Sequence, residues 1–142
     1  MEFEHFDHGA DVGVRGFGAT PAEAFEGAAT ALFALLAEDP STVRGVVEER
    51  IELTAPGLPE LLVAFLNELN SLADTRHLVF GDFVVRIEGS DPGPYRLSAS
   101  AWGEPFDPQR HESTVQPKGA TYTGLRVARE ADRWVAQCVV DV

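Results

Sequence analysis

Several common features of secreted, membrane and catalytic proteins are missing from this chain of 142 residues. Its single cysteine, Cys138, cannot form an internal disulfide, and one thiol does not make a zinc cluster. No apolar run approaches the roughly 20 residues that a membrane-spanning helix requires. The N-terminal segment also lacks the basic start and the apolar stretch of a signal peptide. Together these absences predict a soluble, cytoplasmic protein with no membrane partner.

Basic residues are scarce as well, because 11 lysines and arginines face 23 aspartates and glutamates, which gives a net charge of −12. Proteins that bind nucleic acid directly depend on clustered lysine and arginine to neutralise the phosphate backbone. We therefore expect no direct nucleic-acid binding by this chain alone. An acidic surface favours solubility, divalent cations and basic protein partners, and the charge does not choose among them.

Familiar catalytic motifs are absent too. Gly13, Gly16 and Gly18 superficially suggest a dinucleotide-binding loop, but their spacing is wrong and the acidic partner residue is missing. There is no serine elbow and no cysteine–histidine nucleophile pair, and we expect Cys138 to face a core from the final strand. The sequence therefore argues against a self-contained covalent enzyme.

Two segments have the apolar spacing of α-helices. The first begins with Thr20 as N-cap, Pro21 at the first helical position and Glu23 completing a capping box. We expect it to run to about Ala37 and to stop before the Asp-Pro pair that follows, because a residue before proline avoids the helical region. The second helix opens after a proline- and glycine-rich break at 56–59.

The second helix has a buried stripe that runs from Leu61 to Leu72. Between the apolar positions, Asn67, Glu68 and Asn70 mark a polar side. From Leu78 to the end of the sequence, apolar residues no longer have helical spacing and instead alternate with polar residues, as is typical of β-strands.

Seven segments have the pattern of β-strands, and they are Val12–Phe17, Val46–Thr54, Leu78–Glu88, Tyr95–Ala101, Ser113–Lys118, Thr121–Arg129 and Arg133–Asp141. Gly81-Asp82 could be a tight hairpin or a bulge in one long strand. A polar loop is expected from Gly103 to about Glu112. These elements predict an α+β fold over residues 1–142, with one domain and a largely antiparallel sheet or sandwich on which the two main helices pack.

Titratable groups are concentrated near the N-terminus, at His5, Asp7, His8 and Asp11, and carboxylates also end the chain. The final strand is expected to end inside its sheet, which holds the Val142 carboxylate close to Asp141. Such a pair is costly unless a cation or a donor compensates it, and a hard cation such as Ca²⁺, Mg²⁺ or Mn²⁺ takes oxygen ligands of this kind. Asp11 would supply a third carboxylate. The alternative is a solvated residue at a strand end.

Other polar residues have both a functional and a structural interpretation. His5 and His8 could bind metal or transfer protons, although hydrogen-bonded structural histidines are the commoner case. Asp7 is expected to cap or solvate a turn, and His111-Glu112 to be solvated in the polar loop. Lys118, between Pro117 and Gly119 in a chain short of lysine, is either a functional cation or an exposed strand end.

Five short motifs follow one another along the chain, and they read His8-Gly9-Ala10-Asp11, Thr20–Phe25, Leu61–Asn67, Lys118–Tyr122 and Asp141-Val142. Together they resemble the archease family over essentially the whole chain. Two positions depart from the family pattern, since Gly9 stands where threonine is usual and Thr123 where histidine is usual. Neither position is among the three candidate metal ligands.

The resemblance implies an accessory protein that is not itself an enzyme. Archeases assist a GTP-dependent RtcB-type RNA ligase in tRNA splicing or RNA repair, and they promote guanylylation and multiple turnover of the ligase. The family has a divalent-metal site, assigned to calcium, that maps onto Asp11, Asp141 and Val142. Its ligase-activating lysine maps onto Lys118, and His8 is a candidate for contacting a metal ligand.

Two other functions stay open. A small metal-dependent hydrolase could use the same carboxylates, with His8 as acid or base. A chaperone-like binding module would need no metal. The accessory role ranks first because the sequence has no complete catalytic set.

Overall fold

The computed structural model describes residues 2–113 and 115–142, so Met1 and Thr114 lie outside the description. Within this part of the chain there are eight strands, two α-helices and one short 3₁₀ turn, η1. Their order is β1 (Phe3–His8), β2 (Asp11–Gly18), α1 (Pro21–Phe33), η1 (Pro40–Thr42), β3 (Val47–Ala55), α2 (Leu58–Arg76), β4 (Leu78–Glu88), β5 (Tyr95–Pro105), β6 (Gly119–Ala120), β7 (Arg126–Glu130) and β8 (Arg133–Asp141).

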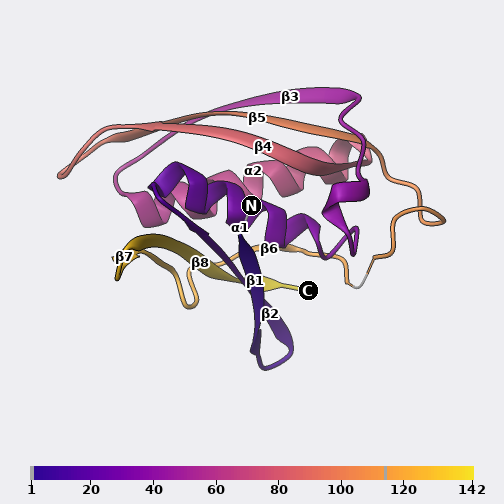
Figure 1. The fold of residues 1–142 in the computed structure, drawn as a ribbon, viewed down its shortest axis with the longest axis horizontal. Coiled ribbons are helices and arrows are strands. Elements are labelled where there is room, and N and C mark those ends of the chain that lie inside the picture. Colours follow the sequence, from indigo (N-terminus) through magenta and orange to yellow (C-terminus); the bar gives the residue numbers. More distant parts are fainter. Residues whose placement is uncertain (1, 114) are drawn as a thin grey trace.

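The two helices lie between two antiparallel sheets (Figure 1). The three-stranded sheet has the order β3-β5-β4, and the larger sheet has the order β1-β2-β8-β6, with β7 also paired to β8. The predicted α+β class and antiparallel pairing are confirmed. The helices have a sheet on each side, so both helices need apolar residues over a wide arc.

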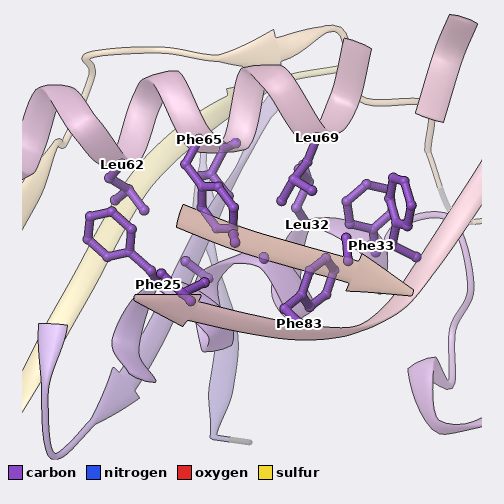
Figure 2. Close-up of a cluster of buried hydrophobic side chains, with 14 of the residues drawn as sticks. Phe25, Leu32, Phe33, Leu62, Phe65, Leu69 and Phe83 are labelled. Atoms are coloured by element: carbon purple, nitrogen blue, oxygen red, sulfur yellow. The ribbon is translucent and has the colours of Figure 1, made fainter. Parts of the chain in front are cut away.

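A continuous apolar core joins the helices to both sheets (Figure 2). Phe25 of α1 stacks on Phe65 of α2 with ring centroids 6.1 Å apart. Phe33 of α1 meets Phe80 of β4 edge to face at 5.4 Å. Burial of each such side chain stabilises the fold by about 1.5–3 kcal/mol. This core fixes the larger sheet relative to the helices.

The predicted start of α1 is confirmed. Thr20 Oγ1 accepts a hydrogen bond from Glu23 N at 3.2 Å, and Glu23 Oε2 accepts one from Ala19 N at 2.8 Å. The helix ends at Phe33, short of Ala37, because the chain tightens into three-residue turns such as Leu36 N to Phe33 O at 3.0 Å. Neither described helix has the length and hydrophobicity needed to cross a membrane.

Gly81-Asp82 forms a bulge within one long strand, β4. The register passes from Phe80 opposite Gly103 to Asp82 opposite Trp102, so Gly81 is the extra residue. The expected polar loop also begins later than Gly103, because β5 continues to Pro105.

The larger sheet differs most from the prediction. β1 was not expected, because histidine and acidic side chains conceal its alternation. The strand expected at 113–118 is wrong, since its described residues form a loop and the pairing with β8 begins only at the two-residue strand β6 that follows; Thr114 lies outside the description. The strand expected at 121–129 shortens to β7 because the chain turns at Gly124, which has a φ of +63°.

α1 and β2 approach each other backbone to backbone at Gly16. A methyl group at this position would overlap the Ala24 carbonyl oxygen and the Ala28 nitrogen. On the helix side, a Cβ at Gly27 would lie 2.9 Å from the Gly16 Cα. The two glycines therefore set how closely the helix packs on the strand that begins with Asp11.

Replacing Gly16 with alanine should lower the free energy of unfolding by about 2 kcal/mol or more, because overpacking forces the helix and the strand apart. Urea denaturation measures the change. Gly9→Asn is the matched control, since Gly9 has open space around it and a φ of +61° that asparagine tolerates. Equal losses in both variants would contradict the close-approach explanation.

Candidate functional site

Asp11 and Asp141 lie opposite each other at one end of the larger sheet. Val12 pairs with Val140, so the residue before Val12 faces the residue after Val140 across the antiparallel pair. Because side chains alternate, both aspartates point to the face away from these two valines. The Val142 nitrogen donates a long hydrogen bond, 3.4 Å, to Asp11 Oδ1. The β1–β2 hairpin and the end of β8 thus bring three candidate metal ligands together.

Lys118 joins the same end of the sheet from the other side of β8. Its backbone nitrogen donates to the Asp141 carbonyl oxygen at 2.8 Å, and Gly119 pairs with Asp141. The Lys118 side chain is exposed and forms no ion pair with any described residue. A cationic side chain therefore starts from the backbone position next to the carboxylates.

His8 pairs with Asp11 across the β1–β2 hairpin. Gly9 and Ala10 form the two-residue loop between them, and a φ of +61° at Gly9 explains why glycine suits the first position of this turn. His8 is exposed and belongs to the same row of the sheet as the aspartates. Its place is compatible with contact to a metal ligand.

His5 and Asp7 do not join this group. The His5 Nε2 lies 2.7 Å from the Ala31 carbonyl oxygen, to which it donates a hydrogen bond, so His5 fastens β1 to the end of α1. Asp7 is exposed, and alternation puts it on the side of β1 that carries His5. His5 thus has the hydrogen-bonded, structural placement that the sequence favoured, whereas Asp7 lies within β1 and not in the expected turn.

His111 is buried, and the prediction of a solvated side chain is wrong. Its ring stacks on Phe106 with centroids 5.6 Å apart, and its Nε2 lies 3.0 Å from Glu104 Oε2. The Asp107 nitrogen donates to Nδ1 at 2.9 Å, which identifies Nε2 as the ring donor. Arg110 also pairs with Glu104. No sequence motif indicated that the His111 ring would bind the buried Glu104 carboxylate. Glu112 is exposed, as expected.

Cys138 faces the core, as expected. Burial raises the pKa of its thiol to about 12, so the thiolate needed for nucleophilic attack is not available near neutral pH. This side chain takes no part in the chemistry of the site.

The oxygen donors of the site suit a hard divalent cation. Carboxylates of Asp11 and Asp141, the Val142 carboxylate and water are ligands of the kind that Ca²⁺, Mg²⁺ and Mn²⁺ accept. The described residues contain no cluster of three or more histidine, cysteine, aspartate or glutamate side chains able to hold a metal. Besides the Asp11 and Asp141 side chains, a cation here would need main-chain oxygens or water as ligands, and the metal site stays a prediction.

Comparison with known proteins gives a consistent result. Residues 3–142 match the model of the Archease protein family. The chain belongs to the archease family. It is 44% identical over 142 residues to protein archease of Pyrococcus furiosus, covering 99% of each chain. The solution structure of protein 1598 from Methanobacterium thermoautotrophicum has a TM-score of 0.84 and 32% identity, covering 99% of this chain and 98% of that one.

A second solved structure shares the fold alone. The crystal structure of an archease from Thermotoga maritima, described as a possible chaperone, has a TM-score of 0.53 and 17% identity. It covers 96% of this chain and 94% of that chain. The archease fold is therefore recognisable at low sequence identity.

Sequence reasoning missed the part that two asparagines of α2 play in this archease-family chain. Asn67 Oδ1 accepts from Ala120 N at 2.8 Å, and Asn67 Nδ2 donates to Ala120 O at 3.2 Å. Asn70 Nδ2 lies 3.4 Å from Pro117 O and 3.3 Å from Lys118 O. The available signal was the polar side of the second helix, with two amides one turn apart. These amides hold the Lys118 segment against β8.

Asn67→Ala should lower the free energy of unfolding by about 1–3 kcal/mol, because it leaves both backbone groups of Ala120 without their partner. Hydrogen exchange of the Ala120 amide should also become faster. Urea denaturation and amide exchange measured by NMR check these outcomes. Glu68→Ala, at an exposed neighbour on the same helix, is the control. Equal changes in unfolding free energy and in Ala120 amide exchange in the two variants would refute the holding role of Asn67.

Burial in the fold, followed by the Arg110 guanidinium, lowers the pKa of His111 from its ordinary value of 6.5. The unfolded chain therefore binds this proton more readily than the folded chain does. The stability that the neutral ring contributes is present above pH 6.5 and is lost as the pH falls below it.

The urea midpoint should accordingly decrease between pH 7.5 and pH 5.5, and the decrease should be smaller in His111→Gln. The comparison uses the change with pH in each protein, so a general loss of stability in the variant does not affect it. An identical decrease in both proteins would remove His111 from the explanation.

Proposed function

We propose that this protein is an accessory activator of a GTP-dependent RtcB-type RNA ligase, acting in the cytoplasm in tRNA splicing or RNA repair. In this proposal it promotes guanylylation of the ligase and multiple turnover, and it does not catalyse ligation itself. One observation carries the proposal most directly: Asp11, Lys118 and Asp141-Val142, far apart in the sequence, meet at one end of one sheet.

The proposed roles follow from the chemistry of these groups. Asp11, Asp141 and Val142 would hold a divalent metal, with Ca²⁺ as the first candidate and Mg²⁺ or Mn²⁺ also suitable, which would supply positive charge at the edge of the sheet. Lys118 would present its ammonium group to the guanylylation site of the ligase, and His8 would contact a metal ligand. The net charge of −12 supports docking on a basic, RNA-binding enzyme in place of direct contact with RNA.

Asp11→Asn removes one carboxylate charge with little change in shape. Calorimetric titration with CaCl₂ should show binding to the wild type and about tenfold or greater weakening in this variant, as expected when a metal's coordination is disturbed. Asp132→Asn, an exposed acid in the β7–β8 turn, is the control and should bind as the wild type does.

A ligation assay with GTP, Mn²⁺ and limiting ligase then tests function. Wild-type protein and Asp132→Asn should raise the number of turnovers per ligase, whereas Asp11→Asn and Lys118→Gln should not. Equal stimulation by Asp11→Asn would reject the role of the metal site. Absence of any stimulation by the wild type would reject the accessory role.

The same preparations separate the two alternatives. Phosphatase or nuclease activity of this protein alone, lost in His8→Ala, would identify a metal-dependent hydrolase. Stimulation of the ligase without detectable metal binding would identify a metal-free, chaperone-like module.

A further inference from the structure

A hollow of about 360 Å³ opens between the carboxyl end of α2 and the loop that leads to β6. Three of its apolar lining residues are buried, Leu36, Ala73 and Leu78, and with the half-buried Phe106 they form an apolar floor. Pockets of this size commonly take a small ligand, and an apolar floor favours a group with an aliphatic part. The hollow lies outside the group of carboxylates described above.

The rim of the hollow is polar and has one fixed charge. Asp74 is exposed on α2 and forms no ion pair within the described residues. None of the described residues that line the hollow is an arginine or a lysine. The nearby Arg76 forms an ion pair with Glu49, with Nε and Oε1 3.3 Å apart. Within the described part of the chain, the carboxylate of Asp74 therefore has no cationic partner.

The position of the hollow at the end of α2 adds to this negative potential. A helix leaves its last carbonyl groups without helical partners, and its carboxyl end has a partial negative charge that favours cations. His77 closes the helix with a φ of 55°, and its carbonyl oxygen accepts from Phe106 N at 2.9 Å. The carboxylate and the helix end thus favour a positive charge at the same place.

We propose that this hollow receives an arginine side chain of the protein partner. The aliphatic stem would pack on the apolar floor, and the guanidinium would pair with Asp74 and donate to the side-chain oxygens of Asn70 or Gln116 at the rim. Arginine fits better than lysine because its planar head has five donors and is less strongly hydrated.

The hollow is continuous with the Lys118 segment, and in this respect the inference rests on the proposed function. Asn70 lines the hollow and also contacts the Lys118 carbonyl oxygen at 3.3 Å. Gln116, on the rim, precedes Lys118 closely in the same loop. A partner anchored here lies against the segment that places Lys118 beside Asp141.

The first experiment measures binding of the RtcB-type ligase by calorimetry. Asp74→Lys should weaken binding by about tenfold or more, because it opposes the incoming guanidinium. Glu68→Lys, on the same helix and also exposed, changes the net charge by the same amount and should have a much smaller effect. Circular dichroism confirms that both variants are folded. Equal weakening by the two variants would overturn the proposal, since it would show a general effect of charge.

The second experiment needs no ligase and so separates the two proposals. N-acetyl-L-arginine amide, titrated to millimolar concentrations, should shift the NMR signals of Asn70, Asp74 and His77, and Asp74→Asn should reduce the shifts at least threefold. Equal shifts with N-acetyl-L-norleucine amide, or no shifts with the arginine compound, would overturn the assignment. If the wild type does not bind the ligase, the proposed function fails, and this titration still decides whether the hollow takes arginine.

Discussion

The pairing of β8 along both of its edges is the constraint on which the candidate site depends. On one edge it binds β2, which begins with Asp11, and on the other it binds β6, which follows Lys118. Ladder hydrogen bonds fix register to a single residue, and a shift of one residue would turn Asp141 to the opposite face. The relative placement of three chain segments therefore follows from the register of one strand.

The helices complete this arrangement because they are held by both sheets. α1 meets β2 at Gly16, and its Glu26 accepts a hydrogen bond from Val85 N of β4 at 2.8 Å. α2 turns the amide of Asn67 toward β6 and that of Asn70 toward the two residues before it. A two-residue strand is too short to hold its place by ladder bonds alone, so the helix supplies the second set of backbone partners. Packing of the apolar core thus also sets the position of a polar loop.

The sequence correctly predicted those elements whose position is set by short-range signals. The cap at Thr20 and the alternation from Arg133 to Asp141 gave a helix start and a full strand correctly. β1 escaped prediction because it is an edge strand with little burial, so polar residues replace its apolar alternation. His111 escaped because its burial depends on Glu104, a contact that only the folded chain creates. The chemistry of the carboxylates suggested that Asp11 joins Asp141, and the resemblance to a family favoured this over a solvated strand end, since strand register over so long a separation is not encoded locally.

Most cations of this acidic chain are arginines, whereas Lys118 starts from the backbone position next to the carboxylates of the site. Six of the ten arginines in the sequence pair with glutamates within the described residues, and these are Arg15, Arg50, Arg76, Arg110, Arg126 and Arg133. Lys118 is the one lysine of the sequence, and it is exposed next to the carboxylates. Exposed ion pairs add little stability, so the pairing of the arginines mainly neutralises positive charge across the surface. A flexible ammonium group on a backbone held by β8 and α2 is then an accessible cation at this edge, and a partner drawn by the surrounding negative charge would meet it there.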